Sequence, residues 1–308
     1  MNGKHACILP ESRRSEAPLF FFEKYQVAYS VVSLTAKEGY RYAMMTLDRI
    51  REKKAFLIDM DGVIYHGKFL LPGVPEFISW LREEGKLYRF VTNNSYFTAA
   101  ELSERLCAMG IDERPEHFYT SAMAAASFCS HQADDPSAWV IGANGLYSAL
   151  EAAGVRITDE NPEFVIVGES EKEYTWQAIE KAVNLVVNGA RLIGTNADLA
   201  GPGSYGLVPA TGAMIAPIEK AAGRKAYFVG KPNPLMLRRV MDSLGVHASE
   251  SVMVGDSMGT DILGALETGM ATVLVLSGMT SEHDIRKYAF RPDVVLQGVG
   301  SIPPVTED

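Results

Sequence analysis

The sequence has few cysteines, no long apolar run and no excess of positive charge. Its three cysteines, Cys7, Cys107 and Cys129, are widely spaced and odd in number, so they match no disulfide framework or metal-binding pattern. Such scattered cysteines favour buried free thiols in a reducing compartment. The net charge of −9 argues against a protein that covers nucleic acid with a basic surface.

Signals for membrane insertion and export are missing as well. No apolar run approaches the roughly 18 residues that a membrane-spanning helix needs. The four apolar residues at 19–22 are followed by Glu23 and Lys24, which makes this stretch a poor signal peptide. We therefore expect a cytoplasmic protein that binds neither membrane nor nucleic acid.

The composition is that of an ordinary globular protein, with 47% hydrophobic and 22% charged residues among 308. The most informative local pattern is A-F-L-I-D-M-D-G-V at 55–63. Its apolar start is typical of a strand buried on both faces, and Asp59, Asp61 and Gly62 should end that strand. Taken alone, this stretch fits a functional acidic pair and an ordinary turn about equally well.

Short apolar runs alternate with helical patterns from residue 55 onward. The runs predict strands at 55–58, 87–91, 118–120, 138–141, 163–167, 191–194, 251–254, 272–276 and 294–296. Helical spacing and capping residues predict helices at 74–84, 99–109, 145–153, 176–188, 211–222, 235–244 and 261–268. Strand–helix–strand repetition with short connections indicates parallel strands joined by right-handed crossovers.

This order predicts an α/β protein with a doubly wound, Rossmann-like parallel sheet core and an inserted α/β domain. We expect 51–122 and 208–308 to form the core and 123–207 to form the inserted domain. We treat residues 1–50 as an N-terminal extension without a clean period, apart from a short amphipathic helix predicted at 46–54 that leads into the first strand.

Polar residues follow four of the apolar runs in the expected core. They are Asp59 with Asp61, Thr92 with Asn93, Lys231, and Asp256 with Asp261. Taken alone, each fits an ordinary turn or helix cap. Parallel strands deliver their carboxyl ends to one edge of a sheet, where open α/β sheets bind their ligands. The joint pattern therefore predicts a single site.

These residue types suit phosphoryl transfer, because an anionic substrate must be neutralised and positioned. Asp59 is ionised at neutral pH and can attack phosphorus to form an aspartyl-phosphate. Asp61 can protonate the leaving oxygen and later activate water. Thr92 and Asn93 can donate hydrogen bonds to the phosphoryl oxygens, and Lys231 can supply positive charge.

Several carboxylates in one site repel one another unless a cation joins them. Oxygen ligands suit a hard ion, so we expect Mg²⁺ as the cofactor. The expected metal site comprises Asp59, Asp61 through its backbone carbonyl, Asp256 and Asp261. For Asp261, two roles stay open: holding a metal-bound water or orienting Lys231.

With these positions, the sequence resembles the haloacid dehalogenase superfamily of aspartate-nucleophile phosphatases. The matching motifs are D-M-D-G-V at 59–63, T-N-N-S at 92–95, G-K-P at 230–232 and G-D-S-M-G-T-D at 255–261. Within the superfamily it looks like the capped type IIA branch of 4-nitrophenylphosphatases and nucleotide phosphatases. T-N-A-D-L at 195–199 and G-L-V-P-A-T-G-A at 206–213 also resemble this branch.

The resemblance implies a phosphatase whose inserted domain caps the site and admits a small phosphate monoester, such as a nucleotide or a sugar phosphate. It suggests Asn196 and Asp198 as substrate-binding residues of the cap, and a homodimer formed through the cap. Ala197, Ser257 and Glu169 depart from the usual residues of the branch, which leaves the substrate open. A phospho-accepting module and a catalytically silent binding protein on the same fold remain as alternatives.

Overall fold

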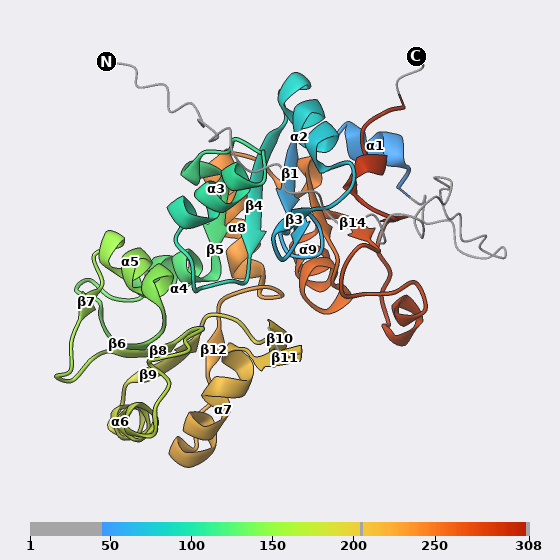
Figure 1. Ribbon diagram of the computed structural model, residues 1–308. Coiled ribbons are helices and arrows are strands. Elements are labelled where there is room, and N and C mark those ends of the chain that lie inside the picture. Colours follow the sequence, from blue (N-terminus) through green and yellow to red (C-terminus); the bar gives the residue numbers. More distant parts are fainter. Residues whose placement is uncertain (1–44, 204–205, 306–308) are drawn as a thin grey trace, which may run out of the picture.

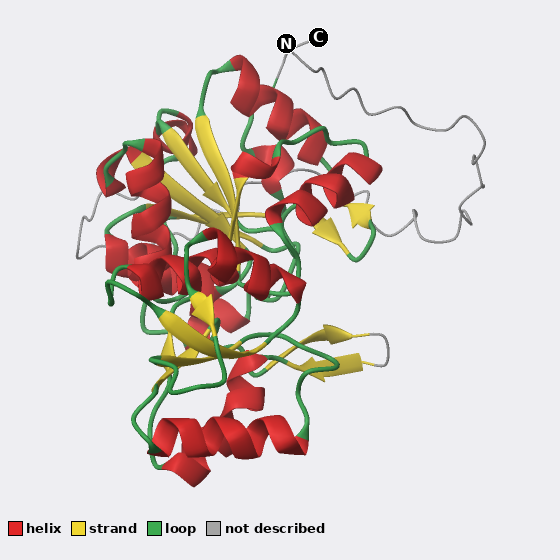
Figure 2. Ribbon diagram, turned by 90° about the vertical axis from the view of Figure 1, so that its left-hand side faces the viewer, coloured by secondary structure: helices red, strands yellow, loops and turns green. Residues whose placement is uncertain are grey.

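The computed structural model describes residues 45–203 and 206–305, which form two parallel sheets (Figure 1). One sheet has six strands in the order β15-β14-β13-β1-β4-β5, and the other has five in the order β12-β9-β8-β6-β7. Figure 2 shows the two sheets one below the other, each with helices around it. The predicted fold class, a doubly wound α/β core with a second α/β unit, is confirmed.

The first sheet is parallel throughout and has β1 near its centre, between β13 and β4. Its strands are β1 (Ala55–Ile58), β4 (Leu87–Thr92), β5 (Phe118–Thr120), β13 (Ser251–Gly255), β14 (Ala271–Val275) and β15 (Val294–Leu296). Its helices are α1 (Leu47–Arg51), α2 (Val74–Glu83), α3 (Ala99–Ala108), α8 (Pro234–Leu244) and α9 (Leu263–Thr268). Short helical turns lie at Pro115–His117, Ala248–Glu250, Met258–Ile262, Asp284–Lys287 and Val299–Ser301.

Strand β1 is buried on both faces, as its unbroken apolar run predicts. Phe56 and Ile58 pack into a hydrophobic cluster with α2 and α3, whereas Ala55 and Leu57 pack into a second cluster with α8. The chain order reverses at this strand, with β4 and β5 on one side and β13, β14 and β15 on the other. In open α/β sheets, a crevice at such a reversal is the usual ligand site.

The second sheet is also parallel. Its strands are β6 (Ser137–Ile141), β7 (Arg156–Ile157), β8 (Phe164–Val167), β9 (Arg191–Gly194) and β12 (Tyr227–Phe228). Its helices are α4 (Ser121–Ser130), α5 (Asn144–Ala152), α6 (Trp176–Val187) and α7 (Thr211–Ala222). One face packs with α4 and α5, and the opposite face packs with α6 and α7.

Helix α4 joins the two sheets, and our sequence analysis did not predict it. Ala122, Ala125 and Cys129 are buried in a hydrophobic cluster that also holds Leu57 of β1 and Phe164 of β8. A helix that is apolar around its whole circumference has no polar face, so its sequence shows no amphipathic period. The small side chains of this helix allow the two sheets to share one core.

The second sheet includes more of the chain than the sequence predicted. Strand β12 pairs with β9, and α7 packs in the same cluster as α6, although both follow residue 207. A short apolar run does not reveal which sheet it joins, because long-range pairing decides that. We therefore propose that the inserted domain runs from α4 to β12. Residues 1–44 of the expected extension lie outside the described residues, and Ile50 near its end is buried in the core.

Two antiparallel hairpins flank the sheets. The first, β2 (Tyr65–His66) with β3 (Phe69–Leu70), follows the acidic pair of the first strand. The second, β10 (Ala200–Gly203) with β11 (Gly206–Pro209), projects sideways from the second sheet (Figure 2). Within the described part of the chain, no helix is long and apolar enough to cross a bilayer. Cys129 is a buried free thiol, as the sequence predicts for this position.

The buried carboxylate of Glu113 is the centre of a second polar cluster in the first unit. The carboxylate of Glu113 accepts hydrogen bonds from Arg82 Nη2 at 2.7 Å and Tyr88 Oη at 2.8 Å, and it contacts His117 Nδ1. Burial alone would raise the pKa of Glu113, but these hydrogen bonds and the charge of Arg82 outweigh it and lower the pKa. The ionised form of Glu113 is therefore favoured by folding.

We predict that Glu113→Gln lowers the free energy of unfolding at pH 7 by about 1–3 kcal/mol, because charge-assisted hydrogen bonds are lost. A lowered folded-state pKa stabilises the protein above the unfolded value of about 4.3, and this gain disappears as the pH falls below it. Urea unfolding at pH 7 and below pH 4 should show the difference between variants shrinking. Glu104→Gln, at an exposed position of α3, is the control; an equal loss in both variants would contradict the prediction.

Candidate active site

The predicted strand ends meet at the carboxyl edge of the first sheet. Asp59 follows β1, Thr92 ends β4, and Asp256 follows β13. Because β1 pairs with both β4 and β13, these three positions are neighbours across the sheet. The edge also contains the reversal of chain order, so the topology itself creates the site.

Lys231 connects the charged groups of this site. Its side chain is 1% exposed, and its Nζ donates hydrogen bonds to Asp59 Oδ1 at 2.7 Å and to the carbonyl of Val91 at 3.0 Å. Asp261 Oδ1 also lies 2.7 Å from Nζ, as an ion pair without hydrogen-bond geometry. Burial alone would lower the pKa of Lys231, but the charges of Asp261 and Asp59 raise it. Lys231 is therefore a fixed ammonium at neutral pH.

Three carboxylates crowd around this single ammonium. Oxygen atoms of Asp59, Asp256 and Asp261 lie within 4.8 Å of one another, the arrangement expected of metal ligands. Burial raises the pKa of all three groups, and their mutual repulsion raises it further. One ammonium cannot balance three negative charges, so the cluster favours a further cation.

Backbone atoms pack closely around the carboxylate of Asp256. Its Oδ2 accepts a hydrogen bond from the backbone N–H of Met279 at 2.6 Å. A Cβ added to Gly278 would lie 1.9 Å from Oδ2, and one added to Gly62 would lie 2.3 Å from it. Gly62 also has a φ of +77°, which favours glycine. Asp261 Oδ1 accepts no hydrogen bond from the described residues. An all-oxygen site of this kind suits Mg²⁺.

Asp61 is exposed and lies two residues after Asp59, next to the β2–β3 hairpin. Its backbone forms a bridge with Tyr65, and the guanidinium of Arg105 stacks 4.7 Å from the Tyr65 ring. Although exposed, Asp61 is crowded by protein atoms on several sides, and this desolvation raises its pKa against the lowering charges of Arg105 and His66. A carboxyl group with a raised pKa can carry a proton to a leaving group. Its side chain is not among the clustered carboxylates.

Thr92 and Asn93, both predicted to donate to phosphoryl oxygens, have different hydrogen-bond partners in the structure. The Thr92 hydroxyl oxygen accepts a hydrogen bond from Asn94 N at 3.1 Å, which leaves its proton to donate. The amide of Asn93 is fully engaged with the backbone of Lys231 and the carboxylate of Asp198. Of these two residues, Thr92 is therefore the one whose side chain can still donate a hydrogen bond to a phosphoryl oxygen.

The cap residues predicted to contact substrate also lie in a hydrogen-bonded network. Asp198 Oδ2 accepts from Asn93 Nδ2 at 2.8 Å and from Asn196 Nδ2 at 2.7 Å. Asn196 is 1% exposed. Both residues therefore belong to the junction between the two units, and the structure gives them protein partners.

Further hydrogen bonds hold this junction together, and the sequence did not predict them. The Ser95 hydroxyl accepts hydrogen bonds from Glu169 N at 2.9 Å and Thr195 Oγ1 at 3.2 Å, and Ser95 N donates to the Glu169 carboxylate. Burial raises the pKa of Glu169 to about 7. A Cβ on Gly145 would lie 2.6 Å from the Phe97 backbone. In the sequence, T-N-N-S is followed by two aromatic residues, and this pattern does not show that the loop contacts the second unit.

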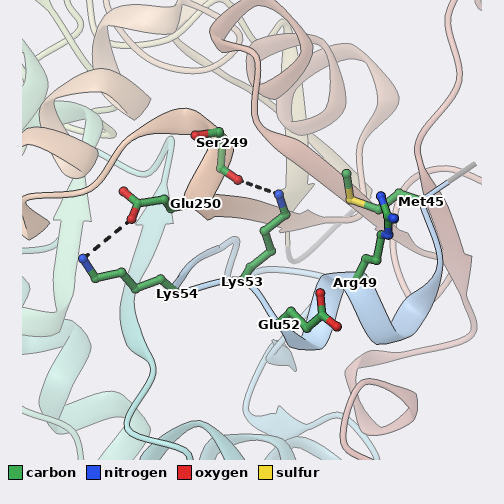
Figure 3. Close-up of a pocket in the computed structure, with 7 residues that line it drawn as sticks. All are labelled: Met45, Arg49, Glu52, Lys53, Lys54, Ser249 and Glu250. Atoms are coloured by element: carbon green, nitrogen blue, oxygen red, sulfur yellow. Dashed lines mark hydrogen bonds and ion pairs between the residues drawn. The ribbon is translucent and has the colours of Figure 1, made fainter. Parts of the chain in front are cut away.

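A cavity of about 540 Å³ lies at the opposite, amino-terminal edge of the first sheet. Figure 3 shows its lining residues, Met45, Arg49, Glu52, Lys53, Lys54, Ser249 and Glu250. Lys53 Nζ donates to the Ser249 carbonyl at 2.6 Å, and Lys54 lies 3.9 Å from Glu250. The cavity shares no residue with the aspartate cluster, so its size does not make it the site of the chemistry.

Comparison with known proteins identifies the family. A model described as haloacid dehalogenase-like hydrolase matches residues 56–156, and a related HAD-hydrolase-like model matches 228–302. The chain is 42% identical over 254 residues to dihydroxyacetone phosphatase of Corynebacterium glutamicum, covering 82% of this chain and 92% of that protein. The chain belongs to the haloacid dehalogenase-like hydrolases. The resemblance inferred from the four motifs is confirmed.

Other members of the family cover nearly the same range. Ribonucleotide monophosphatase NagD of Escherichia coli is 42% identical over 249 residues, which are 81% of this chain and 98% of NagD. The solved NagD structure has a TM-score of 0.77, with 41% identity and coverage of 82% of this chain and 98% of that one. A 4-nitrophenylphosphatase of Thermotoga maritima has a TM-score of 0.78, with 34% identity and coverage of 82% and 96%. The prediction of a phosphatase-type enzyme is confirmed.

We predict that Gly278→Ala weakens binding of a divalent cation at least about tenfold, because the new methyl group must displace Asp256. Calorimetric titration with Mn²⁺ measures this without any assay of activity. Gly298→Ala is the matched control, since a Cβ there meets nothing within 4 Å. Equal Mn²⁺ affinity in the two variants would mean that Asp256 does not hold the ion.

Proposed function

We propose that this protein hydrolyses a small phosphate monoester through an aspartyl-phosphate on Asp59, with Mg²⁺ as its cofactor. The observation that carries the proposal is the buried Lys231, which lies 2.7 Å from both Asp59 and Asp261. These two carboxylates form a cluster with Asp256. This arrangement fixes a nucleophile beside one positive charge and places carboxylate ligands for a further cation at the same sheet edge. Both features are what phosphoryl transfer requires of a protein.

In the first step, a carboxylate oxygen of Asp59 attacks phosphorus. The bond from phosphorus to the leaving oxygen breaks, and Asp61 donates its proton to that oxygen. Lys231 holds Asp59 Oδ1, which restricts the carboxylate to one orientation for attack. The Thr92 hydroxyl donates to a phosphoryl oxygen.

In the second step, the ionised Asp61 takes a proton from water, and the water oxygen attacks phosphorus. The bond from phosphorus to Asp59 then breaks, which releases inorganic phosphate and restores the carboxylate. Bound Mg²⁺ would neutralise negative charge on the phosphoryl group and on its ligands Asp59, Asp256 and Asp261. Lys231 contributes its charge to the same oxygens throughout.

The proposals for the substrate, the oligomeric state and the location rest on the family rather than on the geometry of the site. The relatives are named dihydroxyacetone phosphatase, ribonucleotide monophosphatase and acid sugar phosphatase, so we propose a small phosphate monoester of a sugar, a three-carbon compound or a nucleotide as the substrate. A homodimer formed through the inserted domain and a cytoplasmic location are part of the same proposal. Sedimentation of the purified protein tests the dimer.

We predict Mg²⁺-dependent release of phosphate from 4-nitrophenyl phosphate, which EDTA abolishes and added Mg²⁺ restores. Asp59→Asn should remove turnover, because the attacking charge is gone. Asp242→Asn, on the exposed side of α8, is the control and should retain it. Full turnover by the metal-free protein, or by Asp59→Asn, would refute the proposed function.

The role of Asp61 predicts a dependence on the leaving group. Asp61→Asn cannot donate a proton, and loss of general acid–base help typically costs about 10²- to 10⁴-fold in rate. We predict a smaller loss with 4-nitrophenyl phosphate, whose leaving group needs little protonation, than with glycerol phosphate. Parallel measurements of kcat on both esters check this. Equal losses would exclude Asp61 as the acid.

A further inference from the structure

The catalytic lysine stands outside both sheets, three residues after the end of β12. One side chain holds its backbone in place. Asn93 Oδ1 accepts the N–H of Lys231 at 2.8 Å, and Asn93 Nδ2 donates to the carbonyl of Lys231 at 2.9 Å. The amide thus pairs with both backbone groups of one residue, as a neighbouring strand would. These two hydrogen bonds hold the backbone position from which the Lys231 side chain reaches Asp59.

Asp198 of the inserted domain stabilises the orientation of the Asn93 amide that Lys231 requires. A carboxylate accepts hydrogen bonds and donates none, so Asp198 requires that the nitrogen end of the amide face it. The reversed amide would bring its oxygen against both Asp198 and the Lys231 carbonyl. It would also leave the N–H of Lys231 facing a second donor. Asp198 therefore reinforces the orientation in which the Asn93 amide binds both backbone groups of Lys231.

Asp198 is itself well anchored. Its Oδ2 accepts a second hydrogen bond from the buried Asn196, and its backbone carbonyl accepts the N–H of Gly212 at 2.9 Å. A Cβ on Gly230 would lie 2.5 Å from the Thr195 carbonyl and 2.6 Å from Asn93 Oδ1, so these segments are packed without slack. Asp198 is therefore held in a fixed position relative to Asn93.

We infer that Asp198 is a positioning residue, which fixes Lys231 beside Asp59 by orienting the amide of Asn93. This inference rests on the proposed function and assigns Asp198 a role different from the substrate contact that the sequence suggested. It makes the inserted domain part of the machinery that aligns the nucleophile. The two roles for Asp198 differ in their kinetics. A lost substrate contact raises KM for particular substrates, whereas misplacement of Lys231 lowers kcat for every substrate.

The kinetic test uses 4-nitrophenyl phosphate, dihydroxyacetone phosphate and a ribonucleotide monophosphate. We expect Asp198→Ala to lower kcat about tenfold on each active substrate, the order expected for a charge-assisted hydrogen bond, with little change in KM. Asp198→Asn keeps one acceptor and should recover most of the loss. Glu180→Ala, an exposed carboxylate of α6, is the control. In the double variant with Asn93→Ala, removing Asp198 should cost nothing more.

Hydrogen exchange of the Lys231 amide provides a readout independent of catalysis. Asp198→Ala should speed this exchange at least about tenfold, and Asp198→Asn should speed it less. Glu180→Ala should leave it unchanged. An unchanged Lys231 amide in Asp198→Ala, or a loss confined to KM on one substrate, would overturn the inference. A wild-type protein inactive on all three esters would refute the proposed function, while the exchange rates would still decide the role of Asp198.

Discussion

The structure depends on one buried cation. Lys231 is almost inaccessible to solvent and lies 2.7 Å from both Asp59 and Asp261. A buried ammonium is costly unless it is paired, and buried carboxylates are costly for the same reason. Removing Lys231 would leave adjacent negative charges without a partner, and removing an aspartate would leave the ammonium underpaired. The site is thus a balance of charges whose remaining negative excess favours a divalent cation.

The fold provides that balance by bringing distant segments to one edge. Parallel strands β1, β4 and β13 supply Asp59, Thr92 and Asp256 side by side. Lys231 comes from a different source, because the chain reaches it directly from β12 of the second sheet. The segment between the sheets is held by the backbone hydrogen bonds Val229–Gly194 and Gly230–Thr195. The inserted domain is consequently coupled to the reactive centre through both its chain connection and its polar contacts.

Much of this was predictable because the governing signals are local. Apolar runs that end in Asp59 or Asp256 specify both a strand and the location of its charged end, so the core and its acidic cluster followed from the sequence. Other features depend on contacts between segments that are far apart in the sequence. The uniformly apolar α4 carries no period, and nothing in Tyr227 or Phe228 shows that β12 joins the second sheet. The partners of Asn93 likewise depend on where the second unit docks, which T-N-N-S cannot encode.

The central claim is that Asp59 receives the phosphoryl group, whose negative charge is balanced by Lys231 and by a cation that the carboxylate cluster would hold. The most direct test mixes Asp61→Asn with substrate and Mg²⁺, quenches in acid within milliseconds, and measures the mass of the protein. Because this variant keeps the nucleophile but activates water poorly, the phosphoryl-enzyme should accumulate, and peptide mapping should place the group on Asp59. A phosphoryl group on any other residue, or continued turnover with no covalent adduct, would contradict the mechanism.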